Sequence, residues 1–449
     1  MKPFILLIQA VITMFFFSCT STKTQDKKDD KNQRVVFKNV NLLSGDGSAA
    51  KKSDVFVENG KIAEISSNLV EEDASIVDLT GKTMMPALIS THVHIGTLKD
   101  TVTNAGNYTR ENIFNQLNKY GAYGVLNVQS LGTDQPLLFQ NGLYDSIKNG
   151  LLDGARMLSA GYGFNIPQAN INPASPMNKL FRPVTAAQVP AEMDSLAALN
   201  IKIVKIWVDD FNKTLPKMDP EVYHAIINEA HKRNIRVAAH VYYLSDARRL
   251  VSDGVDILAH SIRDSIVDDA FLAEMKSKQV IYVPTLTLDK FSYVYAGEPE
   301  WINDPFFKAS LEPGTYEMIT SEKYKNDTKN SPAYARNENG FKTAMANLKK
   351  IFDAGIPVAL GTDSGAFPIR TQGFSEHLEM QLLTEAGLTP LQAIRIATKN
   401  AADALGLNDY GVIEKGKVAD LLILDGDPSV DIKNTRKISV VYKNGIKVQ

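Results

Sequence analysis

Histidine is scarce in this chain, and four of its seven copies occupy positions where they could hold a metal ion. His92 and His94 are separated by one residue, so in a strand their imidazoles face the same side. His240 and His260 each end a short apolar run, and Asp363 lies between glycines after another. Neutral imidazoles and a carboxylate are ligands for zinc or a similar divalent cation. These five residues therefore predict a metal site.

Each of these residues has a structural alternative when it is considered alone. A histidine at the end of a strand is commonly a hydrogen-bonded core residue, and an aspartate between glycines is commonly a turn residue. His92-Val93-His94 on its own is a weak motif. The occurrence of all five residues at the ends of successive apolar runs favours a shared metal site.

Lys205 is a sixth candidate, because it interrupts an otherwise apolar run that ends at Trp207. A bare ammonium group is repelled by a nearby metal ion, so Lys205 would have to act in another form. Addition of CO2 to its amine gives a carbamate, whose two oxygens can bridge two cations. Lys202 lies three residues earlier, on the opposite face of a strand, and is a poorer candidate. The alternative is a lysine whose stem packs while its amine reaches water.

The elements that would position these residues are eight β-prone segments, each bounded by turn residues. Amphipathic stretches separate most of them, and Asp219-Pro220-Glu221 is typical of a helix start. Eight alternating strands and helices predict an α/β fold, a (β/α)8 TIM barrel, whose active site lies at the C-terminal ends of its strands. The expected strands are Met84–His92, Gly124–Gln129, Ala155–Ala160, Lys202–Val208, Arg236–Val241, Asp256–His260, Val280–Thr285 and Pro357–Thr362.

Strand-like pieces separated by turns also occur at both ends of the folded region, which predicts one small β-sandwich domain built from both termini. Asn444-Gly445 is a typical hairpin turn of its second part. The predicted boundaries are residues 35–85 for the first part, 86–409 for the barrel and 410–449 for the second part. Residues 289–342 are rich in Tyr, Asn, Pro and Gly, and we expect them to form an insertion, a lid over the barrel mouth.

The N-terminus has the pattern of a targeting segment. Lys2 precedes an apolar run that ends at Phe17, which is too short for a membrane span and typical of a secretory signal. Ser18 followed by Cys19, the single cysteine, resembles a bacterial lipoprotein cleavage site. We expect a signal peptide at 1–18, lipidation of Cys19 and a disordered tether at 19–34, which places the protein in the bacterial cell envelope with a lipid anchor as its membrane contact. The alternatives are an uncleaved anchor and plain secretion.

Composition excludes several classes of protein. The chain has 449 residues, with 49 basic and 51 acidic side chains and 44% apolar residues. An apolar fraction of this size is incompatible with overall disorder. The net charge of −2 argues against a dedicated nucleic-acid binder, and one cysteine excludes a disulfide scaffold. The sequence gives no prediction of oligomeric state.

The order HxH, Lys, His, His, Asp resembles the amidohydrolase superfamily of metal-dependent hydrolases. Three further stretches resemble its entry strand, its terminal helices and its return into the β domain. They are Thr83–Ile89, Gly387–Ala393 with Ala397–Ala402, and Gly411–Asp420.

Two features favour a branch of that superfamily. Deaminases and imidazolone hydrolases usually carry an acid two or three residues after the strand-five histidine, whereas His240 is followed by no acid before Asp246. A lysine at the strand-four position and a tyrosine after His240 resemble the binuclear Xaa-Pro dipeptidase-like branch, with imidazolonepropionase-like relatives. The resemblance implies two divalent metals, zinc or else Mn, Fe or Co, and CO2 for lysine carboxylation. It assigns His92, His94 and Asp363 to the inner metal, His240 and His260 to the outer one, and carboxylated Lys205 to the bridge.

This reading gives three side chains a part in the chemistry. Asp363 would accept a proton from a metal-activated water and pass it to the leaving nitrogen. Strand alternation favours Tyr242 over Tyr243 as a donor to the developing oxyanion, and Tyr242 would also contact substrate. Arg263 could clamp a substrate carboxylate, the alternative being a surface ion pair.

The sequence therefore predicts a metal-dependent amidohydrolase that cleaves a C–N bond of a small amide or peptide-like substrate, such as a dipeptide or an N-acyl amino acid. The alternatives are a cyclic amide hydrolase or a deaminase of the same superfamily, and a non-catalytic binding lipoprotein.

Overall fold

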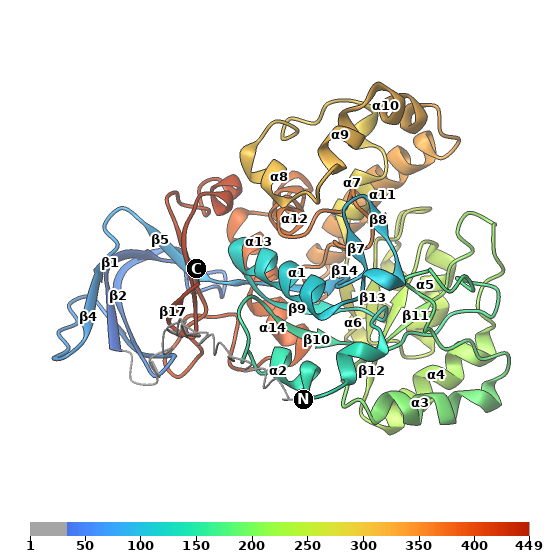
Figure 1. The fold of residues 1–449 in the computed structure, drawn as a ribbon, viewed down its shortest axis with the longest axis horizontal. Helices are drawn as coiled ribbons and strands as arrows, with labels where there is room; N and C mark the ends of the chain where they lie inside the picture. Colours follow the sequence, from blue (N-terminus) through green and yellow to red (C-terminus); the bar gives the residue numbers. More distant parts are fainter. Residues whose placement is uncertain (1–33, 449) are drawn as a thin grey trace, which may run out of the picture.

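A computed structural model describes residues 34–448. Strands from both ends of this region form one mixed sheet of eight strands at one end of the molecule (Figure 1). Its strands are β1 (Arg34–Leu42), β2 (Lys51–Glu58), β3 (Lys61–Ser66), β4 (Ser75–Asp78), β5 (Thr83–Pro86), β15 (Leu421–Leu424), β16 (Ile438–Lys443) and β17 (Ile446–Lys447). The sheet joins the two termini, because β15 pairs with β5 and β5 pairs with β1.

Tight turns set the register of the hairpins in this sheet. Asn444 and Gly445 both have positive φ, 52° and 73°, and connect β16 to β17 as a two-residue turn. One face of the sheet is held by a cluster of buried apolar side chains from both ends of the chain, including Phe37, Val55 and Leu421. The strands and the Asn444-Gly445 turn are as the sequence indicated, whereas a second layer that would make the domain a sandwich stays a prediction.

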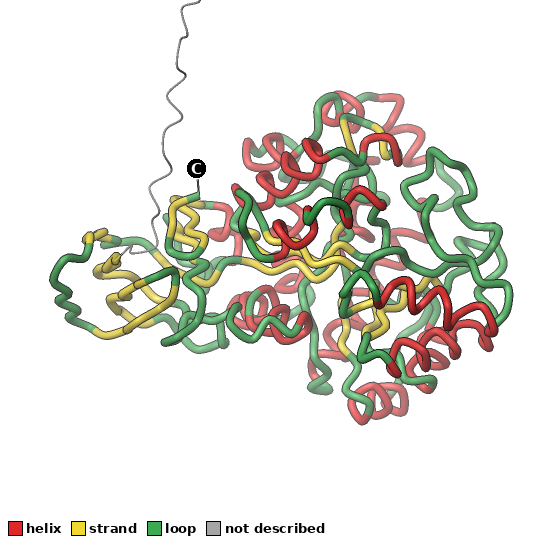
Figure 2. The backbone as a smooth tube through the Cα atoms, turned by 60° about the horizontal axis from the view of Figure 1, so that its bottom comes forward, coloured by secondary structure: helices red, strands yellow, loops and turns green. Residues whose placement is uncertain are grey.

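Two parallel sheets occupy the centre of the larger body, with helices around them (Figure 2). One has the order β10-β9-β6, and the other has the order β11-β12-β13-β14. The strands are β6 (Leu88–Val93), β9 (Val125–Ser130), β10 (Arg156–Ser159), β11 (Ile203–Trp207), β12 (Arg236–His240), β13 (Ile257–Ala259) and β14 (Ile281–Val283). Their parallel pairing confirms the predicted α/β class.

Isolated parallel bridges link the two sheets. Phe164, just after β10, bridges to Ile206 of β11. Residues 357–364 bridge the other edges, through Val358 to Tyr282 of β14 and through Ser364 to Val93 of β6. The chain of paired strands and bridges therefore runs from β6 through both parallel sheets and residues 357–364 and returns to β6.

Two of the expected strands differ from the structure. Met84–His92 is divided at Ala87 into β5, which pairs in the mixed sheet, and β6, which pairs with β9. Residues 357–362 form bridges and no regular strand. The amides of Thr362 and Asp363 both donate to the His92 carbonyl, at 3.1 and 2.9 Å, and Asp363 has φ of 58°. This left-handed turn at Asp363 is incompatible with continued regular strand pairing.

Helices surround the parallel strands, and the sequence accounts well for one of them. The Asp219 carboxylate accepts a hydrogen bond from the Glu221 amide and Pro220 begins the helix, so α4 starts where the sequence indicated. No helix within residues 34–448 has the length and apolar character needed to span a membrane. The helices outside 286–353 are α1 (Arg110–Ala122), α2 (Leu143–Lys148), α3 (Val189–Ala197), α4 (Pro220–Lys232), α5 (Leu244–Ser252), α6 (Asp269–Ser277), α12 (Phe374–Glu385), α13 (Pro390–Ala397) and α14 (Lys399–Leu405).

The segment that we expected as an insertion is largely helical. Figure 1 shows these helices as a layer above the parallel strands. They are α7 (Leu286–Phe291), α8 (Pro305–Ser310), α9 (Thr315–Thr320), α10 (Glu322–Lys329) and α11 (Tyr334–Asp353). The layer is therefore built from residues that follow β14 in the chain.

A buried polar contact holds the mixed sheet against the parallel strands. The Arg156 guanidinium, at the start of β10, donates to the Asp420 carboxylate at 2.5 Å and to the Asn444 side chain at 2.6 Å. Both charged groups are buried, so losing either partner would leave an uncompensated charge.

His377 on α12 makes a second link to the C-terminal region. Its Nδ1 lies 3.0 Å from the Thr435 hydroxyl, and its Nε2 lies 2.9 Å from the Tyr123 carbonyl. A carbonyl can only accept, so the neutral ring donates from Nε2 and accepts at Nδ1. Burial lowers the pKa of His377 from 6.5 to about 3.

We predict that this buried histidine makes the fold sensitive to acid. The folded pKa lies below the unfolded one, so the unfolded state binds the extra proton and stability falls as pH drops from 6.5 toward 3. The wild type should lose about 1.4 kcal/mol per pH unit more than His377→Gln, measured by urea unfolding at pH 7.5 to 5. His224→Gln, a change at an exposed histidine, should follow the wild type. Parallel profiles for wild type and His377→Gln would contradict the prediction.

Candidate metal centre

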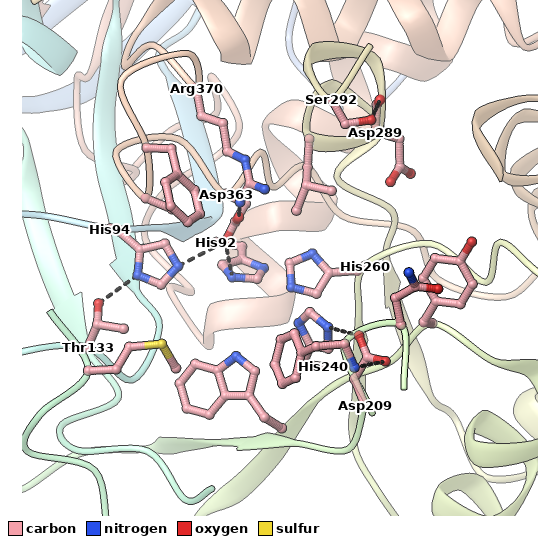
Figure 3. A pocket seen from close by; sticks show the side chains of 18 of the residues that line it. His92, His94, Thr133, Asp209, His240, His260, Asp289, Ser292, Asp363 and Arg370 are labelled. Atoms are coloured by element: carbon pink, nitrogen blue, oxygen red, sulfur yellow. Dashed lines mark hydrogen bonds and ion pairs between the residues drawn. The ribbon is translucent and has the colours of Figure 1, made fainter. Parts of the chain in front are cut away.

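Three of the predicted ligands lie together at the end of β6. His92 Nε2 lies 3.1 Å from Asp363 Oδ1, and His94 Nε2 lies 2.9 Å from the same oxygen. The ligand atoms of the three side chains are within 4.8 Å of one another, and all three residues are buried. Figure 3 shows both imidazoles directed at the Asp363 carboxylate. This cluster comes from two segments that adjoin because residues 357–364 bridge to β6.

His240 and His260 continue this group across the floor of the same cavity (Figure 3). The His260 ring centre lies 4.6 Å from that of His92 and 4.4 Å from that of His240. His240 ends β12, and His260 directly follows β13. The four imidazoles are therefore neighbours although 168 positions separate His92 from His260 in the sequence.

Hydrogen bonds at the outer ring nitrogens orient two of these imidazoles. His94 Nδ1 lies 2.6 Å from the Thr133 hydroxyl, and His260 Nδ1 lies 2.8 Å from the Thr285 hydroxyl. Each contact leaves Nε2 for the interior of the cavity. Such partners are typical of metal-binding histidines, because they fix the ring and its tautomer.

The backbone is strained at the same place. His260, Thr285 and Asp363 are non-glycine residues with positive φ, at 87°, 51° and 58°. That region is costly for residues with a Cβ, and such strain concentrates at functional sites. The strained backbone directs two of the candidate ligands, and a partner of one of them, toward the cavity.

Lys205 lies on β11, among the parallel strands. Its side chain is fully buried, and its Nζ has no hydrogen-bond partner among the described residues. Nζ lies 5.5 Å from the centre of the Trp207 ring. Gly132 makes room for the lysine stem, because a Cβ there would lie 2.6 Å from Lys205 Cβ. Burial lowers the pKa of the Lys205 amine to about 7, so a neutral amine is available near neutral pH.

Burial also sets the charge of the other candidate ligands. It lowers the pKa of His92 to about 3, and it lowers the pKa of His240 and His260 as well. The rings are therefore neutral at pH 7, the form that binds metal. Burial opposes ionisation of Asp363, but the Arg370 guanidinium, with a smaller contribution from the neighbouring His94, outweighs it and holds the pKa of Asp363 well below its usual range.

The unpartnered atoms and the types of side chain in this cluster fit a divalent metal site. The Nδ1 atom of His92 and the Nζ of Lys205 are buried without a hydrogen-bond partner among residues 34–448. Orphaned polar atoms are costly, and neutral imidazoles facing an ionised carboxylate form a common metal-binding set. His92, His94 and Asp363 could hold one cation, and His240 and His260 a second.

A cavity of about 570 Å³ opens above the candidate ligands. Its apolar wall is formed by Met177, Trp207, Phe211, Leu215, Leu288 and Phe367. The helical layer contributes Ser292, Arg336, Asn337 and Gly340. Residues of the expected insertion thus line the site.

The structure separates the two tyrosines that follow His240. Tyr242 lines the cavity, and Tyr243 donates to the Asp210 carboxylate at 3.0 Å and packs under Lys217. Burial raises the pKa of Tyr242, so its hydroxyl keeps its proton at neutral pH.

Arg263 also lines the cavity, but its nitrogens have protein partners. NH1 lies 3.1 Å from Asp289 Oδ1, while Nε and NH2 donate to the carbonyls of Ser261 and Val241. The guanidinium carbon lies 4.9 Å from the centre of the Tyr242 ring. The ion pair of Arg263 is therefore a buried one with Asp289 and not a surface pair, and its role as a clamp for a substrate carboxylate stays a prediction.

The structure adds contacts that the sequence did not indicate. Arg370 pairs with Asp363 Oδ2. Asp209, which strand alternation places on the same face as Lys205, accepts a hydrogen bond from His240 Nε2 at 3.0 Å. Thr133 and Thr285 follow β-prone segments, so their position at strand ends was a usable signal. Arg336 and Arg370 lie in irregular or inserted segments, where no periodicity indicates a direction.

The other histidines lie outside the cavity. His224 and His231 pair with Asp253 and Asp256 on the surface, and His377 is buried beneath α12 as described above.

Known proteins resemble this chain in sequence and in fold. An ochratoxinase of Aspergillus niger is 27% identical over 256 residues, which are 54% of this chain and 45% of that protein. The chain thus spans about half the length of this curated relative. The crystal structure of A. niger ochratoxinase has a TM-score of 0.69 at 19% identity, covering 93% of this chain and 96% of that one.

A Xaa-Pro dipeptidase crystallised with methionine in its active site has a TM-score of 0.71 at 20% identity, covering 92% of this chain and 99% of that one. At this level of identity the two structures establish a likeness of fold. The model of the Amidohydrolase family matches residues 83–448, which include every candidate ligand. The chain therefore belongs to the amidohydrolase family, as its motifs indicated.

Proposed function

We propose that this protein is a metal-dependent hydrolase of a carbon–nitrogen bond in a small amide, with N-acyl amino acids and dipeptides as the substrate class. The observation that carries the proposal is the convergence of His92, His94, His240, His260 and Asp363 on one cavity above a buried Lys205. Ochratoxinase and the Xaa-Pro dipeptidase are named as hydrolases, which supports the reaction class.

We assign the inner cation to His92, His94 and Asp363 and the outer cation to His240 and His260, with Lys205 as a carbamate between them. Two divalent cations, zinc or else Mn, Fe or Co, would supply an acidified water and a polarised carbonyl when bound. The buried, unpartnered amine supports the carbamate, because CO2 adds to the neutral form and the product is an anion that neighbouring cations stabilise.

Asp363 moves the proton in this proposal. Its ionised carboxylate accepts a proton from the attacking water and delivers it to the leaving nitrogen. Arg370 holds the carboxylate in place through Oδ2. The hydroxyl of Tyr242 keeps its proton and can donate to the oxyanion that develops on the carbonyl.

The surroundings of His240 favour amide hydrolysis over deamination. Asp246, the first acid after His240 in the sequence, pairs with Lys217 at 2.6 Å and does not line the cavity. Asp209, which does lie beside His240, is held by that imidazole.

We also propose the domain plan that positions the site. The two parallel sheets and residues 357–364 are one (β/α)8 barrel, spanning 86–409, and the mixed sheet is a β-sandwich domain of 35–85 and 410–449. The bridges at Phe164, Val358 and Ser364 support the barrel, because they link the outer strands of the two parallel sheets.

We propose that the protein is anchored in the cell envelope through lipid on Cys19. The signal at 1–18, Cys19 and the tether at 19–34 lie outside the described residues, so this proposal rests on the sequence pattern.

The metal site is tested by single substitutions in purified protein. His92→Ala and Asp363→Asn should each lower kcat/KM by more than about 100-fold, because each removes a ligand. Chelation should abolish hydrolysis of N-acyl amino acids or dipeptides, and Zn²⁺ or Mn²⁺ should restore it. His224→Ala, on the exposed surface, should retain full activity. Unchanged turnover in His92→Ala or in chelated protein would refute the assignment.

The bridge is tested by metal content. Lys205→Ala should bind one metal per chain in place of two, because the bridging anion is gone. Added acetate should restore part of its activity by replacing that anion, and protein prepared with carbon-13 bicarbonate should show a carbamate resonance that Lys205→Ala lacks. Lys202→Ala changes an exposed lysine directly before β11 and should keep two metals. Two metals in Lys205→Ala would disprove the bridge.

The anchor is tested by metabolic labelling with palmitate in a bacterial host. The wild type should be labelled and membrane-associated, whereas Cys19→Ser should be unlabelled. An unlabelled wild type would end this part of the proposal.

A further inference from the structure

Three arginines line the cavity, and two of them are paired. Arg370 pairs with Asp363, and Arg263 pairs with Asp289 at 3.1 Å. Arg336 forms no ion pair with any carboxylate within residues 34–448, although its side chain is partly buried. The Arg336 guanidinium is therefore available to form charge-assisted hydrogen bonds with an anion that enters the cavity.

Arg336 is placed by the helical layer. It lies in the first turn of α11, and its guanidinium carbon lies 4.1 Å from the centre of the Tyr242 ring. Arg263 lies 4.9 Å from the same ring, so Tyr242 is flanked by two guanidinium groups. One turn later, Gly340 lies against the same two residues, since a Cβ built there would be in ordinary van der Waals contact with Arg263 Cβ at 3.4 Å and with the Tyr242 hydroxyl at 3.5 Å. The arginine is therefore held beside the residue that we assign to the reacting carbonyl.

The acids of the cavity show the opposite pattern. Asp209, Asp289 and Asp363 are the carboxylates that line it within the described chain, and each already has a cationic or imidazole partner. Asp289 Oδ2 accepts no hydrogen bond among residues 34–448, but the charge of this carboxylate already faces Arg263. Elsewhere the wall is largely apolar, with Met177, Phe211 and Leu215 among its residues. An entering carboxylate would find an unpaired cation, whereas an entering ammonium group would find no unpaired acid.

We infer that Arg336 binds the free carboxylate of the substrate, and that the preferred substrates are amino acids whose nitrogen carries an uncharged acyl group. Arg263 then acts as a positioning residue, which holds Tyr242 and Asp289. This inference rests on the proposed amide hydrolysis and narrows it, because it disfavours dipeptides with a free amino terminus.

The test compares substrates that differ in one charge, using metal-loaded full-length protein. N-acetyl-leucine and N-acetyl-leucinamide differ in the carboxylate. In the wild type the acid should have the higher kcat/KM. Arg336→Met should lower kcat/KM for the acid by about 10- to 100-fold, mainly through KM, and leave the amide unchanged. Lys342→Met removes an exposed cation of the same helix and should preserve the wild-type ratio. Melting temperatures check that each variant is folded.

Two outcomes would overturn the role of Arg336. If Arg336→Met keeps the preference for the acid, the carboxylate binds elsewhere. If Arg263→Met removes that preference while Arg336→Met does not, Arg263 is the clamp. We expect Arg263→Met to lower kcat for both substrates alike, since it disturbs Tyr242.

Glycyl-leucine tests the acyl side, because it differs from N-acetyl-leucine by an ammonium group. We expect the acetyl compound to be hydrolysed faster, and the reverse order would refute the preference for uncharged acyl groups.

Calorimetry with the same ligands separates this inference from the proposed function. Binding of N-acetyl-leucine to the wild type but not to Arg336→Met, without hydrolysis, would retain Arg336 and refute the hydrolase. Absence of both binding and hydrolysis would refute the inference itself.

Discussion

The rest of the site depends on an amine that is buried without a partner. Lys205 is enclosed by the parallel strands, and nothing described in the chain receives a hydrogen bond from its Nζ. A fold stabilised by a few kcal/mol does not readily tolerate such a group, unless the group is uncharged or is neutralised by something that binds there. The imidazoles of His92, His240 and His260 above it are also neutral at pH 7 because of burial. The buried amine and the neutral imidazoles together have the character of a metal-binding site.

Strained backbone and side chains from several elements keep the candidate ligands directed at the cavity. The backbone of Asp363 and His260 lies in the left-handed region, and hydroxyls of Thr133 and Thr285 fix the imidazole rings. The arginines contribute from outside the strands, Arg370 from the turn after Asp363 and Arg336 from the helical layer. The strands and the segments directly after them thus supply the groups that we assign to metal binding and proton transfer, and the added helices supply Arg336, which we propose to bind the substrate.

Sequence patterns predicted the strand-borne part of this site and little of the rest. His92, His94 and Lys205 were found because strands alternate their faces with a period of two and because a lysine in an apolar run is conspicuous. The expected strand at Pro357–Thr362 was predicted wrongly. The amides of Thr362 and Asp363 both bond to the His92 carbonyl, and this partner lies about 270 positions away in the chain, where no local pattern could indicate it. Arg263 was noticed, but its pairing with Asp289 requires knowing where α7 packs. Arg336 could not be placed at all, because no local pattern gives the path of an inserted helix.

The central claim is that these six side chains enclose two cations bridged by a carboxylated Lys205. A crystal structure of the protein as purified, with anomalous difference maps recorded at the zinc and manganese edges, tests it most directly. We predict two anomalous peaks, one beside His92, His94 and Asp363 and one beside His240 and His260, with branched density extending from Lys205 Nζ between them. A site without anomalous signal in active protein, or one peak with an unmodified lysine, would contradict it.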